Sequence, residues 1–88
     1  MSITVRYFAS IREALGSSET LSIDGTAGAG PVTVGQLRDR LIASSAAHAA
    51  ALARTRSLRC ALNQVLCDDA TVVPDGAELA FFPPVTGG

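Results

Sequence analysis

Lysine is absent from this chain of 88 residues, whose seven arginines stand against eight Asp and Glu, for a net charge of −1. Such a balance provides no basic field to hold a phosphate backbone, so nucleic acid is not an expected partner. No apolar run comes near the roughly 20 residues that a membrane span requires. The first residues also lack the basic start and apolar centre of a secretory signal. The composition therefore predicts a soluble cytoplasmic protein.

Histidine and cysteine, the usual nucleophiles and metal ligands, are scarce. The chain has one histidine, His48, and two cysteines, Cys60 and Cys67. This is too few for a disulfide scaffold, a tetrahedral zinc site or a Ser-His-Asp triad. We expect His48 to face solvent in an alanine-rich helical segment. The composition argues against a self-contained enzyme.

Two other patterns carry no predicted site. The glycine-rich segment 25–31 lacks the Gly-Lys-Ser/Thr of a phosphate-binding loop, so it is predicted to be a plain loop. Four carboxylates near the end of the sequence do not have the loop spacing that hard cations require. We predict that they form a solvated rim of turns: Asp68, Asp69, Asp75 and Glu78. No metal site is predicted.

Apolar residues make up 48% of the sequence, enough for the core of one domain over residues 1–88. Alternating apolar residues predict strands over residues 3–8, 19–24, 58–63, 65–67 and 77–82. Helical patterns predict helices over residues 10–15, from 33 onward, and 46–53. This order predicts an α+β domain with a mixed sheet.

The clearest local signal for a helix in the sequence begins at Thr33. With Gln36 three residues later it forms a capping box, the start of a helix. Val34, Leu37 and Leu41 then share one helical face, which predicts that this main helix packs on one face of the sheet.

A hairpin is predicted after the third strand, with Asn63 and Gln64 as its two-residue turn. That register places Cys60 opposite Cys67. Because cytosolic thiols are kept reduced, we expect these neighbours to remain unbonded.

The last strand is apolar on both faces. Side chains alternate along a strand, so Leu79 and Phe81 share one face and Phe82 lies on the other. We assign Leu79 and Phe81 to the helix-covered face, and Phe82 with Phe8 to the open face. The alternative is that Phe8 packs under the short helix that contains Ile11.

The end of the sequence is unusual. Pro83 and Pro84 cannot donate to a strand ladder, so they should end the last strand and make the tail over residues 83–88 protrude. Gly87 and Gly88 lack a Cβ and can thread a slot too narrow for other residues.

These features together are similar to a known family. The matching segments are VRYFA (5–9), IRE (11–13), TV (33–34) with Leu37, ALNQ (61–64) and the terminal FFPPVTGG (81–88). The chain resembles the ubiquitin-like sulfur carriers of β-grasp fold, and within them the small subunits of molybdopterin synthase. The resemblance implies one β-grasp domain with a functional Gly-Gly tail.

The resemblance also implies a mechanism. A partner enzyme adenylates the Gly88 carboxylate with ATP, a sulfur donor converts it to a thiocarboxylate, and the large synthase subunit transfers the sulfur to a pterin precursor. This chain would bind no cofactor and would be a sulfur-donating subunit, not an enzyme by itself. The implied partners are the adenylating enzyme and the large subunit, the latter in a heterotetramer.

The residues implied to contact these partners lie on the open face and in the tail: Phe8, Arg12, Phe82, Pro83, Pro84, Val85 and Thr86, with Gly87 and Gly88 as the reacting end. Two alternatives remain open. The chain could carry sulfur for another pathway, such as thiamine synthesis, or it could be a ubiquitin-like protein modifier joined through Gly88.

Overall fold

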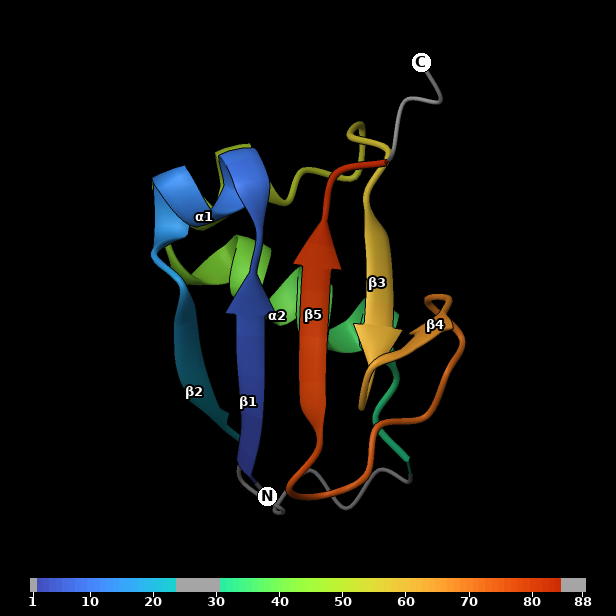
Figure 1. Ribbon diagram of the computed structural model, residues 1–88. Coiled ribbons are helices and arrows are strands. Elements are labelled where there is room, and N and C mark those ends of the chain that lie inside the picture. Colours follow the sequence, from blue (N-terminus) through green and yellow to red (C-terminus); the bar gives the residue numbers. More distant parts are fainter. Residues whose placement is uncertain (1, 24–30, 85–88) are drawn as a thin grey trace.

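The computed structural model describes residues 2–23 and 31–84. Its elements in order are β1 (Ser2–Tyr7), α1 (Ala9–Leu15), β2 (Ser18–Ser22), α2 (Val34–Ser44), α3 (Ala46–Ala51), β3 (Arg59–Leu62), β4 (Val65–Cys67) and β5 (Glu78–Phe82). The sheet order is β2-β1-β5-β3-β4, with β1 parallel to β5 and the other pairs antiparallel. Figure 1 shows α2 crossing behind this sheet. The predicted α+β architecture is confirmed.

The main helix begins where the sequence predicts. The Thr33 hydroxyl accepts a hydrogen bond from the Gln36 backbone N–H at 3.3 Å, and the Gln36 side chain accepts one from the Thr33 N–H at 3.0 Å. At its other end, Ser45 is extended and its hydroxyl accepts from the His48 N–H, so α2 ends there and α3 begins. The alanine-rich helix stops at Ala51, two residues before the predicted end.

The core lies between α2 and one face of the sheet. Along β1 every second residue is buried, as strand alternation requires. Leu79 and Phe81 of β5 are 0% and 1% exposed, which confirms their assignment to the helix-covered face. The largest fully buried side chains are Tyr7, Phe81, Ile3, Ile11, Leu37, Leu41, Leu52, Leu79, Val5 and Val34.

Arg38 of α2 is buried, a feature that the sequence pattern did not predict. Its guanidinium donates hydrogen bonds to the carbonyls of Leu52 at 2.8 Å, Ala53 at 2.6 Å and Arg56 at 3.2 Å. The last carbonyls of a helix lack partners within it. Arg38 therefore holds the end of α3 and the following turn against α2.

The prediction that His48 faces solvent is wrong. Its side chain is only 17% exposed, and its two ring nitrogens lie 2.6 Å from the Ser45 hydroxyl and 2.7 Å from a Glu19 carboxylate oxygen. The same Glu19 oxygen accepts a hydrogen bond from the Tyr7 hydroxyl at 2.7 Å. The alanine-rich sequence of α3 gives no sign of which element the helix packs against. In the structure α3 lies near the edge of the sheet, where Glu19 of β2 contacts His48.

Burial tends to raise the pKa of Glu19, but the hydrogen bonds from His48 and Tyr7 outweigh it and hold that pKa below its usual value. Burial and the hydrogen bond to Glu19 raise the pKa of Tyr7, which therefore stays a neutral donor. The group formed by these three residues is called the His48 network below.

Some predictions concern residues outside those described. Nearly all of the glycine-rich segment 25–31 lies outside them, and so does the end of the tail, residues 85–88.

β5 ends at Phe82, directly before Pro83, as predicted. Within residues 2–23 and 31–84, no helix is long and apolar enough to cross a membrane.

Candidate functional site

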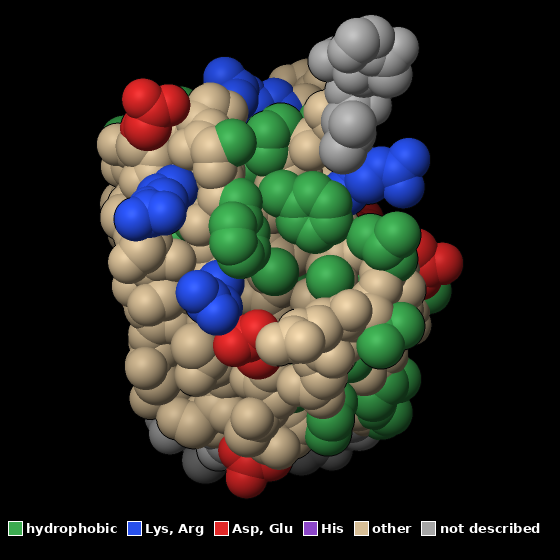
Figure 2. Space-filling model, in the orientation of Figure 1, with side chains coloured by type: hydrophobic (Ala, Val, Ile, Leu, Met, Phe, Trp, Pro, Cys, Tyr) green, Lys and Arg blue, Asp and Glu red, His purple; other side chains and the backbone are tan. Residues whose placement is uncertain are grey.

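The open face of the sheet carries an apolar depression. Figure 2 shows hydrophobic side chains gathered at its centre, with charged groups around them. The depression is about 510 Å³ in volume. We call it the aromatic patch, and its lining residues are Phe8, Phe82, Ala61, Ala80, Arg6, Gln64 and Glu78.

The alternation of β1 extends to Phe8 and so places it on the open face. Phe8 keeps extended angles, φ −131° and ψ 155°, and its N–H donates to the Phe81 carbonyl at 3.2 Å. Ala9 then adopts a left-handed φ of 54° as α1 begins. In the register of β1 with β5, Arg6 lies beside Ala80. Phe8 therefore falls next to Phe82, the following outward residue of β5.

The two rings meet edge to face. Their centroids are 6.5 Å apart and their planes make an angle of 86°, an arrangement that contributes about 0.5–1.5 kcal/mol beyond area burial. The Arg6 guanidinium carbon lies 5.6 Å from the Phe8 ring centroid and 39% of Phe8 is exposed. Phe8 therefore belongs to the open face, and the alternative of packing under α1 is wrong.

A second depression lies at the root of the tail. It is about 590 Å³ in volume and contains Pro84 together with Arg59, the β3 residue that pairs with Phe82. We call it the tail-root hollow; it is lined by Arg38, Arg56, Ser57, Leu58, Arg59, Cys60, Leu66, Cys67, Asp68, Asp69 and Pro84.

The predicted cysteine pairing is confirmed. Cys60 lies opposite Cys67 in the hairpin register, and both thiols are free. Asn63 and Gln64 form the turn with left-handed φ values of 49° and 69°, typical of a two-residue hairpin. Burial, with a hydrogen bond from Cys67, raises the pKa of the Cys60 thiol to about 12.

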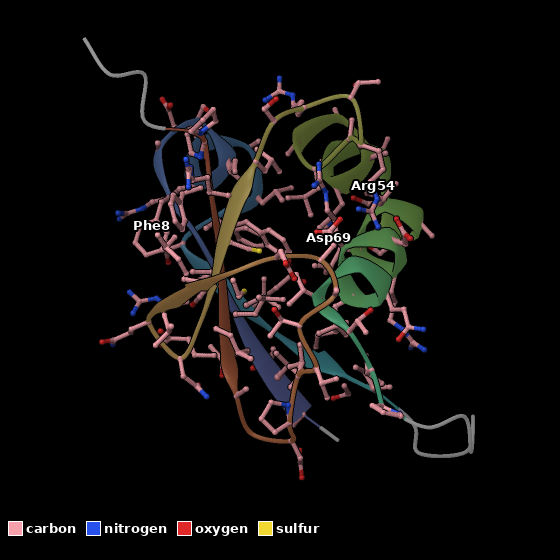
Figure 3. The ribbon with its side chains drawn as sticks, turned by 90° about the vertical axis from the view of Figure 1, so that its right-hand side faces the viewer. Phe8, Arg54 and Asp69 are labelled. Atoms are coloured by element: carbon pink, nitrogen blue, oxygen red, sulfur yellow. The ribbon has the colours of Figure 1, made fainter. Side chains whose placement is uncertain are left out.

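Of the predicted carboxylate rim, Asp69 is paired with an arginine, Arg54. Arg54 forms ion pairs with Asp39 at 2.8 Å and with Asp69, and it donates to the Gly35 carbonyl. The hydrogen bond from Arg54 lowers the pKa of Asp39. Figure 3 shows Arg54 and Asp69 pointing toward one another on the side of the sheet opposite Phe8. No group of three metal-ligating side chains occurs among the described residues.

The structure thus brings Phe8 and Phe82 together, with Pro83 and Pro84 directly following. Arg12 is exposed on α1 and lines neither depression. Val85, Thr86, Gly87 and Gly88 lie outside the described residues. Sequence analysis did not assign five other residues to the patch. Strand alternation and the hairpin register would have placed them on the open face of the sheet: Arg6, Ala61, Gln64, Glu78 and Ala80.

Comparisons with known proteins agree with this geometry. Residues 5–88 match the ThiS family. The chain is 41% identical to the molybdopterin synthase sulfur carrier subunit of Escherichia coli, over 98% of this chain and 99% of the relative.

Two solved structures extend the comparison. Small archaeal modifier protein 1 of Haloferax volcanii is similar with a TM-score of 0.71 and 26% identity, over 96% of this chain and 98% of that one. Subunits 1 and 2 of molybdopterin-converting factor from Helicobacter pylori were solved as a complex, and a chain of it matches at a TM-score of 0.64 and 25% identity, over the whole of both chains.

The fold is that of the ubiquitin-like β-grasp proteins. Within them, the chain belongs to the ThiS family, and its relatives include molybdopterin synthase sulfur carrier subunits. The resemblance stated from the sequence segments is confirmed.

Proposed function

We propose that this chain carries sulfur for a molybdopterin synthase and is the donating subunit, not the catalytic one. The observation that carries the proposal is 41% identity to a sulfur carrier subunit over nearly the whole of both chains. The aromatic patch supports it, because a carrier that works in another protein's site needs a docking surface near its reacting end. The adenylation of Gly88 requires ATP, and the two cysteines are free thiols, as is usual for cytosolic proteins. We therefore place the protein in the cytoplasm.

In this proposal the reacting group is the carboxylate of Gly88. A carboxylate is a poor electrophile, so an adenylating partner joins AMP from ATP to it and releases pyrophosphate. A sulfur donor then displaces AMP and leaves a thiocarboxylate. A thiocarboxylic acid is more acidic than an alkyl thiol, so its sulfur is ionised at neutral pH and nucleophilic.

The large synthase subunit would receive this end and pass the sulfur to a pterin precursor, building the dithiolene that holds molybdenum. ATP and the acid, base and anion-binding groups belong to the partners, and this chain binds no cofactor. The Helicobacter pylori relative, solved as a complex of two subunits, supports a large-subunit partner. We propose a heterotetramer.

The open face beside the tail is the proposed docking surface for both partners. Phe8, which is 39% exposed, and the partly buried Phe82 form an aromatic pair at the end of β5, and partly exposed aromatic groups of this kind are typical of interfaces. Arg12 is a proposed polar contact at its edge.

The tail has two proposed parts. Pro83 and Pro84 have φ fixed by their rings, so they aim the tail away from the sheet at little cost in entropy. Val85 and Thr86 would contact the walls of the partner's channel. Gly87 would pass its narrowest part.

Deletion of Gly88, or Gly87→Leu, tests this proposal in a mixture of ATP, sulfide, the adenylating enzyme, the large subunit and the pterin precursor. We expect both variants to keep their circular dichroism spectrum and to lose sulfur transfer to the pterin. Cys67→Ser is the matched control and should keep transfer. Retained transfer after deletion of Gly88 would overturn the proposal.

The second candidate function is protein modification, favoured by the similarity to small archaeal modifier protein 1. In that case Gly88 would form isopeptide bonds with lysines of other proteins. The chain contains no lysine, so it could not form polymers on its own side chains. Isopeptide-linked Gly88 in digests of cell extract, with no thiocarboxylate, would favour this candidate over sulfur carriage.

A further inference from the structure

Two thiols meet across the β3–β4 hairpin. The Sγ atoms of Cys60 and Cys67 are 3.5 Å apart, and the two residues lie directly opposite in register. The Cys60 thiol also donates to the Cys67 carbonyl at 3.4 Å. A disulfide bond is about 2.05 Å long. The sulfurs therefore need only a modest further approach to bond.

The hairpin can supply that approach. β4 is three residues long, lies at the edge of the sheet and pairs with β3 alone. Its residues Val65 and Leu66 are 68% and 62% exposed, so little packing holds β4 in place. A short edge strand with so few contacts can shift at low cost in free energy.

The two thiols differ in access. Cys60 is 7% exposed, and burial raises the pKa of its thiol to about 12. Both residues line the tail-root hollow, which opens to solvent, but Cys67 is only partly buried and is the more accessible of the two. A small reagent in the hollow would therefore meet Cys67 first, while Cys60 is placed to react with Cys67.

We propose that Cys60 and Cys67 form a modification site for small disulfides, with Cys67 as the attacking thiol and Cys60 as the resolving thiol. Oxidised glutathione is the probe. In the first step Cys67 gives up its proton and its thiolate attacks one glutathione sulfur. A mixed disulfide forms and one glutathione thiolate leaves and takes up a proton.

In the second step the Cys60 thiol gives up its proton and its sulfur attacks the Cys67 sulfur, which expels the second glutathione. Two protein thiols are oxidised to one disulfide, and one oxidised glutathione is reduced to two thiols. The new bond would link β3 to β4 in the wall of the tail-root hollow that also contains Pro84. The site goes beyond the proposed function, because it involves neither Gly88 nor the aromatic patch.

The experiment treats the full chain with oxidised glutathione, traps free thiols with N-ethylmaleimide and measures intact mass. We expect the wild-type chain to lose two hydrogens, to take up no maleimide and to remain a monomer, at a rate independent of protein concentration. Cys60→Ser should stop at the mixed disulfide on Cys67. Cys67→Ser should react at least tenfold more slowly, because its remaining thiol is buried.

Other outcomes would overturn the proposal. These are a wild-type chain that stays reduced, that stops at the mixed disulfide, or that becomes linked to a second chain. A Cys67→Ser variant that reacts as fast as Cys60→Ser would also overturn the assigned order. Circular dichroism checks that each variant is folded, and Cys60→Ala replaces Cys60→Ser if the latter is not.

Discussion

Two neighbouring phenylalanines have opposite roles at the residue scale. Phe81 is 1% exposed beneath α2, whereas Phe82 lies against Phe8 on the open face. The difference follows from strand alternation alone, and it could be predicted from the sequence. It also gives a matched pair of variants.

Phe82→Ala is expected to weaken binding to the large subunit by more than about 1 kcal/mol, or at least about fivefold in Kd, because it removes an aromatic anchor. Its free energy of unfolding should fall by only about 0.5–1.5 kcal/mol, the contribution of the ring pair with Phe8. Phe81→Ala should instead lose about 3–5 kcal/mol of stability by leaving a cavity in the core. Calorimetric titration and urea unfolding measure the two effects; equal destabilisation by both variants would contradict the assignment of faces.

Glu19 gives a prediction about pH. Its pKa in the folded protein is held below the usual value of 4.5 by hydrogen bonds from His48 and Tyr7, despite burial, which acts to raise it. A lowered folded pKa stabilises the fold above the unfolded pKa, and this contribution is lost as the pH falls through 4.5 and below. Glu19→Gln should therefore be less stable than wild type at pH 7, with a gap that narrows in acid.

The matched control is Glu13→Gln, which changes an exposed glutamate of α1. Urea unfolding at a series of pH values between 7 and 3 measures the gap. If Glu13→Gln and Glu19→Gln show the same dependence on pH, the His48 network does not hold Glu19 as described.

At the scale of elements, the capping box makes α2 begin at Val34. Thr33→Ala removes the acceptor for the Gln36 N–H and should cost about 1 kcal/mol of unfolding free energy. Thr33→Ser keeps the hydroxyl and should retain most of that stability. Denaturant titrations of the two variants test this, and an equal loss in both would mean that the hydroxyl does not cap the helix.

Elements defined by local patterns could be predicted from the sequence. The capping box fixed the start of α2, and alternation fixed the buried face of β5, while the Asn63-Gln64 turn fixed the pairing of Cys60 with Cys67. The contacts of α3 could not be predicted, because an alanine-rich helix has no marked apolar face. The burial of Arg38 and the pairing of His48 both follow from where α3 packs, which is a tertiary property.

The same limit applies to the candidate site. Phe8 and Phe82 could be placed on the open face by parity, and the end of β5 by its prolines. Strand alternation places Arg6 on the face of Phe8 and Glu78 on the face of Phe82. That they lie in one patch depends on the pairing of β1 with β5, because strand order does not follow from local patterns. The tail-root hollow likewise needs the loop before β3, α2 and the hairpin to be placed in space.

At the scale of the whole molecule, one face of the sheet is covered by α2, and the other carries an aromatic patch that includes part of β5, the strand that leads into the tail. This division suits a carrier: the covered face supplies stability, and the open face is available to partners. The proposed chemistry then needs only one group of the chain, the carboxylate of Gly88.

The intact mass of the chain, followed by that of its C-terminal peptide, tests this central claim most directly, after incubation of the Cys60→Ser, Cys67→Ser double variant with ATP, sulfide and the adenylating enzyme. The account predicts that sulfur replaces one oxygen at Gly88 and that iodoacetamide alkylates that end. Oxidation of Met1 adds nearly the same mass but gives no site for alkylation. An unchanged Gly88 carboxylate in an incubation that consumes ATP, or sulfur found elsewhere in the chain, would contradict the account.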